Sequence, residues 1–316
     1  MRRSVCITRC YEIFFGNCLD NINRMEILDN DLKEQYKVHL LHLFEKFISF
    51  CEEHSLNYCC TGGTMLGAVR HHGLIPWDDD IDLFMMRKDY ESLIALQSEL
   101  KKINIGLEGI QCNDRFSVFL KIWDMETTLW EIEEIPYVYG VFIDIFPLDY
   151  SDDTPAEFLA KYKKRRRLYL LYKLSQMHFS LASFKNRMIQ RDYKFVAKEL
   201  MSLFIPKSIR GLIRRRILKE DKSNQKKCGK YLASYYGDYW EREYLKSEWF
   251  DDYEMVDFEY LKVKIPSGYD GYLSQIYHDY MKLPPKEKQI SHHYHYFLDL
   301  NQHFSIEQIK SKIKKQ

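Results

Sequence analysis

Hydrophobic residues recur every three or four positions through residues 29–54, and this period predicts a long amphipathic helix there. A second helix is predicted over 89–102, and a short one over 64–71. Short apolar runs predict strands at 56–60, 80–86, 103–107, 116–124, 127–131 and 138–146. We expect Pro147 to end the last strand, because proline cannot donate to a strand ladder.

Two glycines, Gly62 and Gly63, separate the first predicted strand from the short helix. Paired glycines allow unusual backbone conformations and let main-chain N–H groups approach an anion closely. A lone glycine pair is more often only a turn. Together with the hydroxyl of Thr64 at the start of the following helix, the pair is a candidate phosphate-binding loop.

Aspartates alternate with apolar residues at the start of the next predicted strand. Asp80 and Asp82 stand two apart, so on a strand their side chains project from one face. Carboxylates in an apolar strand are costly to bury unless they are paired with a cation. Asp78 and Asp79 fit a solvated loop better. A glycine pair upstream of two such carboxylates suggests nucleotide or phosphoryl chemistry.

A third carboxylate, Asp144, lies between apolar residues in the predicted strand that Pro147 follows. Such a residue needs a partner. A structural hydrogen bond is one explanation, and a third ligand on the metal of Asp80 and Asp82 is the one we favour. Lys121, in the apolar run 118–122, and Arg70 are candidates to bind a phosphate oxygen.

The composition changes after residue 150. Six of the seven residues in 161–167 are basic, and leucines and tyrosines follow them. Such a segment suits an anionic membrane surface or a polyanionic acceptor, although a solvated helix is an equal alternative. Residues 195–219 are again helical and basic, with a break at Pro206. We therefore divide the chain into a lead-in expected to be disordered (1–28, with Met25 as an alternative start), a catalytic core (29–150), a basic helical region (151–228) and a C-terminal segment that completes the cleft (229–316).

The bulk composition restricts the class of protein. The 316 residues are 46% hydrophobic and 29% charged, as in ordinary globular proteins, and the net charge of +1 gives no overall attraction to nucleic acid. The eight cysteines form no CxxC pair, which favours free thiols in a reducing cytoplasm. No apolar run is long enough to span a bilayer, and we expect no signal peptide.

Near the C-terminus, residues 266–270 predict a turn that begins a helix, which Pro284 and Pro285 would stop. A histidine group follows, at His292, His293 and His295. It could contact phosphate or be merely a polar surface.

These motifs resemble the LicD family of phosphotransferases, which includes the catalytic domains of fukutin and fukutin-related protein. The resemblance rests on TGGT at 61–64, LGAVRH at 66–71, GLIPWDDDID at 73–82, FIDIFPLD at 142–149, IPSGYD at 265–270, YMKLPP at 280–285 and His292. Together these motifs cover about residues 30–300. The family places a glycine before Asp-Tyr-Met, where this chain has His278.

The resemblance implies an α+β fold with a nucleotidyltransferase core of the polymerase-β type. It also implies that a phosphorylated alcohol, such as phosphocholine or ribitol phosphate, moves from a CDP-linked donor to a glycan hydroxyl, with the glycan soluble or lipid-linked at the inner face of a membrane. In that reaction Asp80, Asp82 and Asp144 would hold Mg²⁺ or Mn²⁺. Asp144 is also a candidate general base. Trp77, Tyr269, Asp270 and His292 are substrate candidates, the two aromatic residues for a choline ammonium or a sugar.

Three other functions, two of them enzymatic, are compatible with the same residues. The enzyme could transfer a nucleotide to a sugar or small molecule, or it could be a metal-dependent glycosyltransferase that uses Asp-x-Asp. The glycine pair and the separate strand of Asp144 argue against the glycosyltransferase. A catalytically silent glycan-binding relative is the third alternative, and the three aspartates argue against it.

Overall fold

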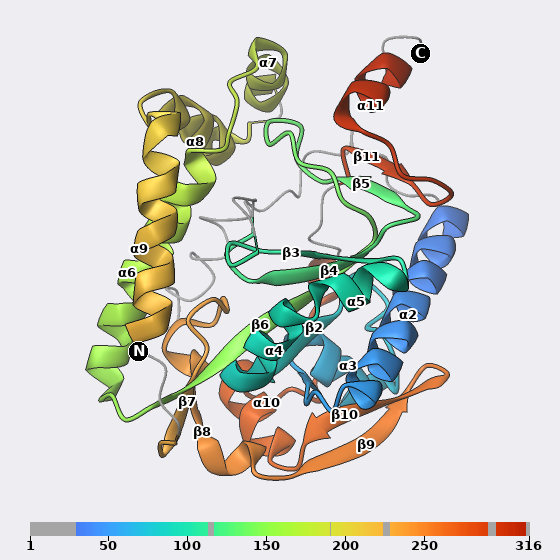
Figure 1. The fold of residues 1–316 in the computed structure, drawn as a ribbon, viewed down its shortest axis with the longest axis vertical. Coiled ribbons are helices and arrows are strands. Elements are labelled where there is room, and N and C mark those ends of the chain that lie inside the picture. The colour runs from blue at the N-terminus through green and yellow to red at the C-terminus, as the bar shows by residue number, and fades with distance from the viewer. Residues whose placement is uncertain (1–29, 113–116, 190, 224–227, 290–294, 314–316) are drawn as a thin grey trace.

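The computed structural model describes residues 30–112, 117–189, 191–223, 228–289 and 295–313. A twisted mixed sheet crosses its centre, with helices packed around it (Figure 1). The strands of this sheet are β1 (Cys59–Cys60), β2 (Asp82–Met86), β3 (Ile105–Glu108), β4 (Leu120–Asp124), β6 (Phe142–Ser151), β7 (Tyr231–Ala233) and β8 (Tyr244–Lys246). This mixture of helices and strands agrees with the α+β class predicted from the sequence.

The central strand of the sheet is β6. Five strands follow the order β1-β2-β6-β4-β3, while β7 pairs with the far end of β6 and with β8. Only the β2–β6 pair is parallel; the other pairs in this sheet are antiparallel. Two small sheets stand apart, one of β9 (Tyr253–Phe258) with β10 (Leu261–Pro266) and one of β5 (Thr128–Trp130) with β11 (Phe297–Asp299).

The prediction that Pro147 ends its strand was wrong, since β6 continues through it to Ser151. The N–H of Asp144 points to β2, where it donates to the carbonyl of Ile81. Main-chain directions alternate along a strand, so the nitrogen of Pro147 points to the opposite edge. On that edge β4 pairs with β6 only as far as Ile145, and β7 pairs with β6 only from Asp149 onward. Pro147 lies in the gap between them and breaks no ladder hydrogen bond.

Helices cover the sheet on both faces. They are α2 (Asn30–Glu53), α3 (Gly62–His71), α4 (Arg87–Ala95), α5 (Gln97–Lys102), α6 (Pro155–Leu174), α7 (Leu181–Ile189), α8 (Tyr193–Leu203), α9 (Arg210–Ser223), α10 (Tyr269–Tyr277) and α11 (Ile306–Ile313). Short 3₁₀ turns are η1 (Lys207–Ile209), η2 (Trp240–Glu243), η3 (Ser247–Phe250) and η4 (Lys286–Lys288). Within the described part of the chain, none of these helices is both long and apolar enough to cross a membrane.

Most predicted helices and strands exist, with three changes near the site. The predicted helix over 89–102 is two helices, α4 and α5, separated at Leu96. The glycine pair is not a turn before a helix, because α3 begins at Gly62. Asp80 precedes β2, whose first residue is Asp82.

The basic run 161–167 lies on α6, but not all of it faces solvent. Arg165 and Arg166 are only 3% and 9% exposed. Arg165 Nη1 lies 2.6 Å from Asp221 Oδ1 on α9, and Arg166 Nη1 lies 2.7 Å from Asp238 Oδ1. Their charges are therefore neutralised inside the protein, which rules out a fully solvated helix.

A buried apolar cluster joins α2, the core of the sheet and the β9–β10 hairpin, with Phe44, Leu83, Ile145 and Val263 among its members. The five cysteines in the described ranges (Cys51, Cys59, Cys60, Cys112 and Cys228) are free thiols, in agreement with the prediction.

Candidate functional site

Three charged side chains line up across the middle of the sheet. In the pairing register, Asp82 on β2 is opposite Asp144 on β6, and Asp144 is opposite Lys121 on β4. Side chains of directly opposite residues project from the same face of a sheet. The strand order therefore places two carboxylates and one ammonium group side by side, although 39 positions separate Lys121 from Asp82 in the sequence.

Lys121 and Asp144 form a buried ion pair. Lys121 Nζ lies 2.6 Å from Asp144 Oδ1, and the residues are 6% and 7% exposed. Burial would lower the pKa of Lys121, but the charge of Asp144 raises it above its usual range. Burial raises the pKa of Asp144 to about 6, although Lys121 opposes this shift. Burial and the other negative charge near Asp144 thus outweigh the effect of Lys121 on the pKa of Asp144.

Two further carboxylates add to that negative charge. Asp80 and Glu131 each contribute to the raised pKa of Asp144, so both lie within electrostatic range of it. Burial raises the pKa of Tyr36 on α2 well above its usual value, and Asp79, Glu131, Asp80 and Asp144 add to this shift. Helix α2 thus closes one side of an acidic site.

The glycine pair lies directly against the aspartates. Gly62 has φ of +52°, a conformation that favours glycine, and a Cβ there would be 3.3 Å from Asp82 Oδ2. A Cβ at Gly63 would be 2.4 Å from Asp78 Oδ2, so a larger residue would displace this carboxylate. The backbone conformation therefore favours glycine at position 62, and acidic side chains approach the start of α3 at both positions.

Hydrogen bonds fix the backbone of the glycine turn, which is the first turn of α3 and begins with Gly62 and Gly63. The Tyr272 hydroxyl on α10 accepts from the Gly62 N–H at 3.1 Å and lies 2.7 Å from the Thr61 hydroxyl. The buried Thr64 hydroxyl accepts from the Asp82 N–H at 2.8 Å. Thr64, which we expected to contact phosphate, thus positions Asp82 in this structure.

Arg70 lies in the last turn of α3, two helical turns from the glycines. Its Nη1 donates to the Tyr280 carbonyl at 2.7 Å, and partial burial lowers its pKa. Asp270 Oδ1 accepts from the Tyr280 hydroxyl at 2.8 Å. Arg70 and Asp270 thus both contact Tyr280, beyond the end of α10.

The other substrate candidates occupy different surroundings. Trp77 packs edge-on against His71, with ring centroids 6.0 Å apart, and Trp77 and Tyr269 are partly buried against the main core. His292 lies outside the described residues.

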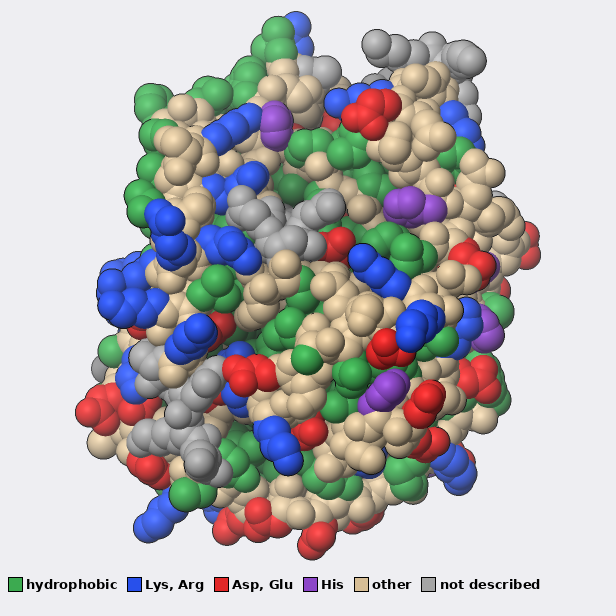
Figure 2. All heavy atoms as spheres, viewed as in Figure 1, with side chains coloured by type: hydrophobic (Ala, Val, Ile, Leu, Met, Phe, Trp, Pro, Cys, Tyr) green, Lys and Arg blue, Asp and Glu red, His purple; other side chains and the backbone are tan. Residues whose placement is uncertain are grey.

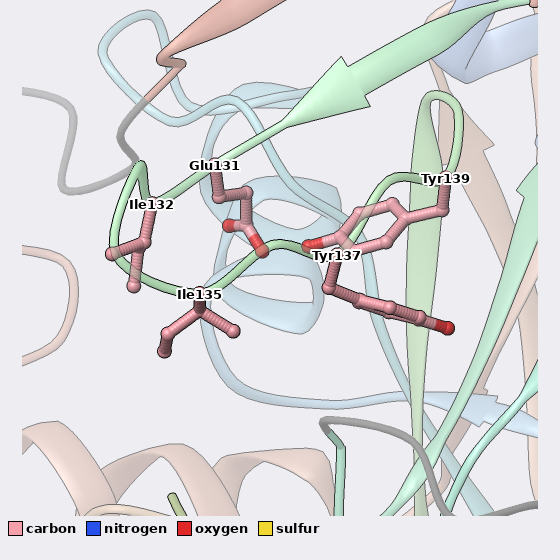
Figure 3. Close-up of a pocket in the computed structure, with 5 residues that line it drawn as sticks. All are labelled: Glu131, Ile132, Ile135, Tyr137 and Tyr139. Atoms are coloured by element: carbon pink, nitrogen blue, oxygen red, sulfur yellow. The ribbon is translucent and has the colours of Figure 1, made fainter. Parts of the chain in front are cut away.

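A small pocket adjoins the Lys121–Asp144 pair. It is lined by Glu131, Ile132, Ile135, Tyr137 and Tyr139. Figure 3 shows the Tyr139 hydroxyl directed toward the Glu131 carboxylate. Tyr139 is 1% exposed, and its hydroxyl has no hydrogen-bond partner among the described residues. Lys121 Nζ is 5.7 Å from the Tyr139 ring centroid, so the pocket and the ion pair are neighbours.

The acidic residues suit a hard divalent cation that the substrate helps to bind. In the described ranges, no three His, Cys, Asp or Glu side chains are gathered into a ready-made metal site. Mg²⁺, however, commonly uses only one or two carboxylates and completes its shell with water and substrate phosphates. Asp82 and Asp144 offer carboxylate oxygens on one face, with the glycine turn beside Asp82. The residues therefore fit an ion that arrives with a diphosphate.

Comparison with known proteins identifies the family. The domain described as LicD/FKTN/FKRP, nucleotidyltransferase domain, matches residues 55–185. Over 269 residues the chain is 30% identical to the lipopolysaccharide cholinephosphotransferase LicD of Haemophilus influenzae, covering 83% of this chain and 96% of that protein. The chain belongs to the LicD family.

Uncharacterised proteins of two Rickettsia species match shorter parts of this LicD family member. That of Rickettsia typhi is 24% identical over 136 residues, which cover 42% of this chain and 41% of that protein. That of Rickettsia prowazekii is 29% identical over 83 residues, 24% of this chain and 31% of that protein. This chain thus spans less than half the length of each.

The matched LicD domain runs from just before β1 into α7. It contains both glycines, the three aspartates and Lys121, whereas α8, α9 and the C-terminal segment lie beyond it. Tyr272, which binds the glycine turn from α10, therefore comes from outside the domain.

Sequence analysis of this LicD protein missed residues of α6 that lie within electrostatic range of the candidate site. The pKa of Tyr169 rises to about 12, chiefly through burial, with Lys121 and Asp144 among the charges that affect it. Burial lowers the pKa of Lys173 to about 8, with Lys198 adding to this and Glu131 opposing it. With Arg166, these residues follow a spacing of three and four along α6, which is one helix face. That spacing is visible in the sequence, but only the fold shows that this face meets the acidic site.

Proposed function

We propose that this protein transfers phosphocholine from a CDP-linked donor to a glycan hydroxyl in the synthesis of a cell-surface polysaccharide or lipopolysaccharide, in the cytoplasm. The observation that carries the proposal is the row of Asp82, Asp144 and Lys121 beside the glycine turn of α3. The Haemophilus relative, which aligns over 96% of its length, is a lipopolysaccharide cholinephosphotransferase. The family description also supports a nucleotidyltransferase core of the polymerase-β type.

The transfer breaks one phosphorus–oxygen bond and makes another. The glycan oxygen attacks the phosphorus that carries choline, CMP leaves, and the hydroxyl proton passes to a base, for which Asp144 is our candidate. Asp80, Asp82 and Asp144 would hold Mg²⁺ or Mn²⁺, which neutralises developing charge on the phosphates when bound. Gly62 and Gly63 let the donor approach the start of α3 closely, and Lys121 keeps Asp144 ionised and oriented.

The pocket of Glu131, Tyr137 and Tyr139 is our candidate for the choline end of the donor, and it must widen to admit this group because its cavity of about 10 Å³ has room for about one water molecule. Aromatic faces and a carboxylate are the groups that bind a quaternary ammonium ion. This pocket lies beside the Lys121–Asp144 ion pair, since Tyr139 neighbours Lys121. A Glu131→Gln variant should raise KM for CDP-choline about tenfold while leaving KM for CDP-ribitol unchanged. Equal effects on the two donors would contradict this assignment.

Product analysis tests the reaction itself. The purified protein is incubated with Mg²⁺, a glycan acceptor and CDP-choline labelled in its choline methyl groups. We expect free CMP and labelled glycan in equal amounts, both abolished by EDTA and restored by Mg²⁺ or Mn²⁺. Pyrophosphate release from CTP and phosphocholine would instead establish nucleotidyl transfer. Transfer of sugar without phosphate from a nucleotide sugar would establish a glycosyltransferase, and a protein that binds the glycan but turns over none of these donors would be a silent relative.

A further inference from the structure

The outward faces of α7 and α8 are apolar. Among the described residues, nineteen large hydrophobic side chains are well exposed, and ten of them lie within residues 179–212. The two most exposed are Phe204, at 84%, and Ile189, at 79%. Figure 2 shows hydrophobic side chains along the upper-left edge of the molecule, where Figure 1 places α7 and α8. Such a concentration marks an interaction surface.

The exposed residues follow the helical period. On α8 and its C-cap, the exposed side chains of Tyr193, Leu200, Met201 and Phe204 are spaced by seven, one and three positions. This spacing puts them in one stripe along the helix. The exposed residues Leu181, Met188 and Ile189 repeat the pattern on α7. Each helix thus presents an ordered apolar face to the outside.

The inward faces of the same helices carry several polar residues, beside the buried apolar Val196 of α8. Glu199 and Ser202 are buried on α8, and Ser183 is buried on α7. Glu199 Oε1 accepts from the Ser180 N–H at 2.9 Å, and the Ser183 hydroxyl donates to Glu134. A surface helix of a protein surrounded only by water has the opposite arrangement. The reversal indicates that the outward faces are adapted to an apolar environment.

Basic residues border the apolar stripes. Residues 179–212 contain seven Lys and Arg and two acidic residues, Asp192 and Glu199. Both acids are engaged inside the protein: Asp192 Oδ1 accepts from the Phe195 N–H at 3.1 Å, and Glu199 accepts from Ser180. Lys185, Arg191, Lys194 and Lys207 are exposed. Their positive charge complements an anionic lipid surface, which attracts basic residues beside an apolar face.

We propose that α7, α8 and the turn that follows α8 dock on an anionic lipid bilayer. The side chains of Ile189 and Phe204 enter the interface, and the exposed lysines contact lipid phosphates. The basic residues Arg165 and Arg166 of α6, part of the segment that first suggested membrane contact, take no part because they pair with Asp221 and Asp238. The inference does not depend on the reaction proposed above, since lipid binding is measured without turnover.

Vesicle flotation tests the proposal with the full chain. Vesicles of phosphatidylcholine mixed with phosphatidylglycerol are compared with vesicles of phosphatidylcholine alone. We expect binding to the anionic vesicles that weakens with added salt. The double variant Leu200→Ser with Phe204→Ser should bind at least about tenfold more weakly. A control, Met255→Ser with Tyr260→Ser, removes side chains of 53% and 63% exposure from the β9–β10 hairpin and should bind as the unchanged protein does.

A charge-reversal variant completes the test, and two results would overturn the proposal. Lys194→Glu with Lys207→Glu keeps the apolar stripe and should weaken binding to anionic vesicles by about tenfold or more. The docking variants should still release CMP from CDP-choline with a water-soluble acceptor, which separates failed docking from failed chemistry. Absence of flotation by the unchanged protein would overturn the proposal. So would a concentration-dependent dimer in sedimentation velocity that the Leu200/Phe204 variant abolishes, because a second copy would then cover this face.

Discussion

The centre of the sheet and the helical layer of α6 to α9 both concentrate charge, but they handle it differently. Across β2, β6 and β4, two aspartates and one lysine share one face, and burial raises the pKa of Asp144 to about 6 despite the lysine. In the helical layer each buried arginine of α6 has its own carboxylate. A carboxylate whose pKa stays raised beside its cation is typical of a functional site, whereas matched pairs indicate structure. Density of charge along the sequence does not distinguish the two cases.

The strongest test of this contrast removes one charge from the site. Asp82→Asn keeps the shape of the side chain and the hydrogen bond between the Asp82 N–H and Thr64. We expect kcat/KM for CDP-choline to fall about 10³-fold, because charge neutralisation carries most of phosphoryl transfer. CMP release measures the loss, and circular dichroism should show an unchanged fold. Asp257→Asn, at an exposed ion pair with Lys262, is the matched control. More than a tenth of the original activity in Asp82→Asn would remove Asp82 from the site.

The next largest effect, on stability, is expected when Lys121 in the central sheet is replaced. Lys121→Met leaves the Asp144 carboxylate buried without its partner, which should lower the free energy of unfolding by about 3–5 kcal/mol. Urea denaturation measures this change. The double variant Lys121→Met with Asp144→Leu should recover most of the loss, because no isolated charge remains. If the double variant is less stable than Lys121→Met alone, the broken ion pair is not the cause of the lost stability.

Removal of a matched ion pair from the helical layer should change the stability of the protein but not its activity. Arg165 contacts Asp221 and the Glu220 carbonyl, and it is 3% exposed. Arg165→Met should lower the free energy of unfolding by about 3 kcal/mol, since the Tyr236 hydroxyl still donates to Asp221. We expect kcat/KM to stay within about twofold of the original at a temperature where the variant is folded. A large fall in kcat/KM would show that the two regions are not separate in function.

The smallest effect is expected at the end of α10. His278 has φ of 65° and ψ of −110°, a conformation that favours glycine, and glycine is the residue that the family resemblance led us to expect there. His278→Gly should therefore raise the free energy of unfolding by about 1 kcal/mol. His303→Gly, at a position whose φ is not positive, is the control and should not stabilise the protein. A less stable His278→Gly would mean that the imidazole makes contacts worth more than the strain.

The sequence predicted most of the fold because its patterns are local. The helical period gave α2 to within a residue at each end, and apolar runs gave β2, β3 and β4. Pro147 was misjudged because the cost of a proline in a strand depends on what pairs with each edge. That information lies in residues 120–124 and 231–233, far away in the chain.

The candidate site was predicted in part for the same reason. Asp82 and Asp144 stand in apolar strands, and this local conflict between charge and burial identified them. That Lys121 is opposite Asp144 depends on strand order and register, which no local pattern specifies. The contributions of Glu131, Tyr169 and Lys173 depend on how a loop and α6 pack over the sheet. These contacts could be recognised only after the fold was known.

The continuation of β6 past Pro147 has a consequence for how the molecule can be divided. Its first half carries Asp144, and its second half carries Asp149, which binds Arg87 and pairs in register with Ala233 of β7. One strand is thus common to the candidate site and to the segment that returns after the helical layer. A fragment cut at residue 150 would keep Asp80, Asp82 and Asp144 but leave the end of β6, from Asp149 onward, without its neighbour β7. Expression of the two parts as separate polypeptides should therefore give active protein only when both are present together.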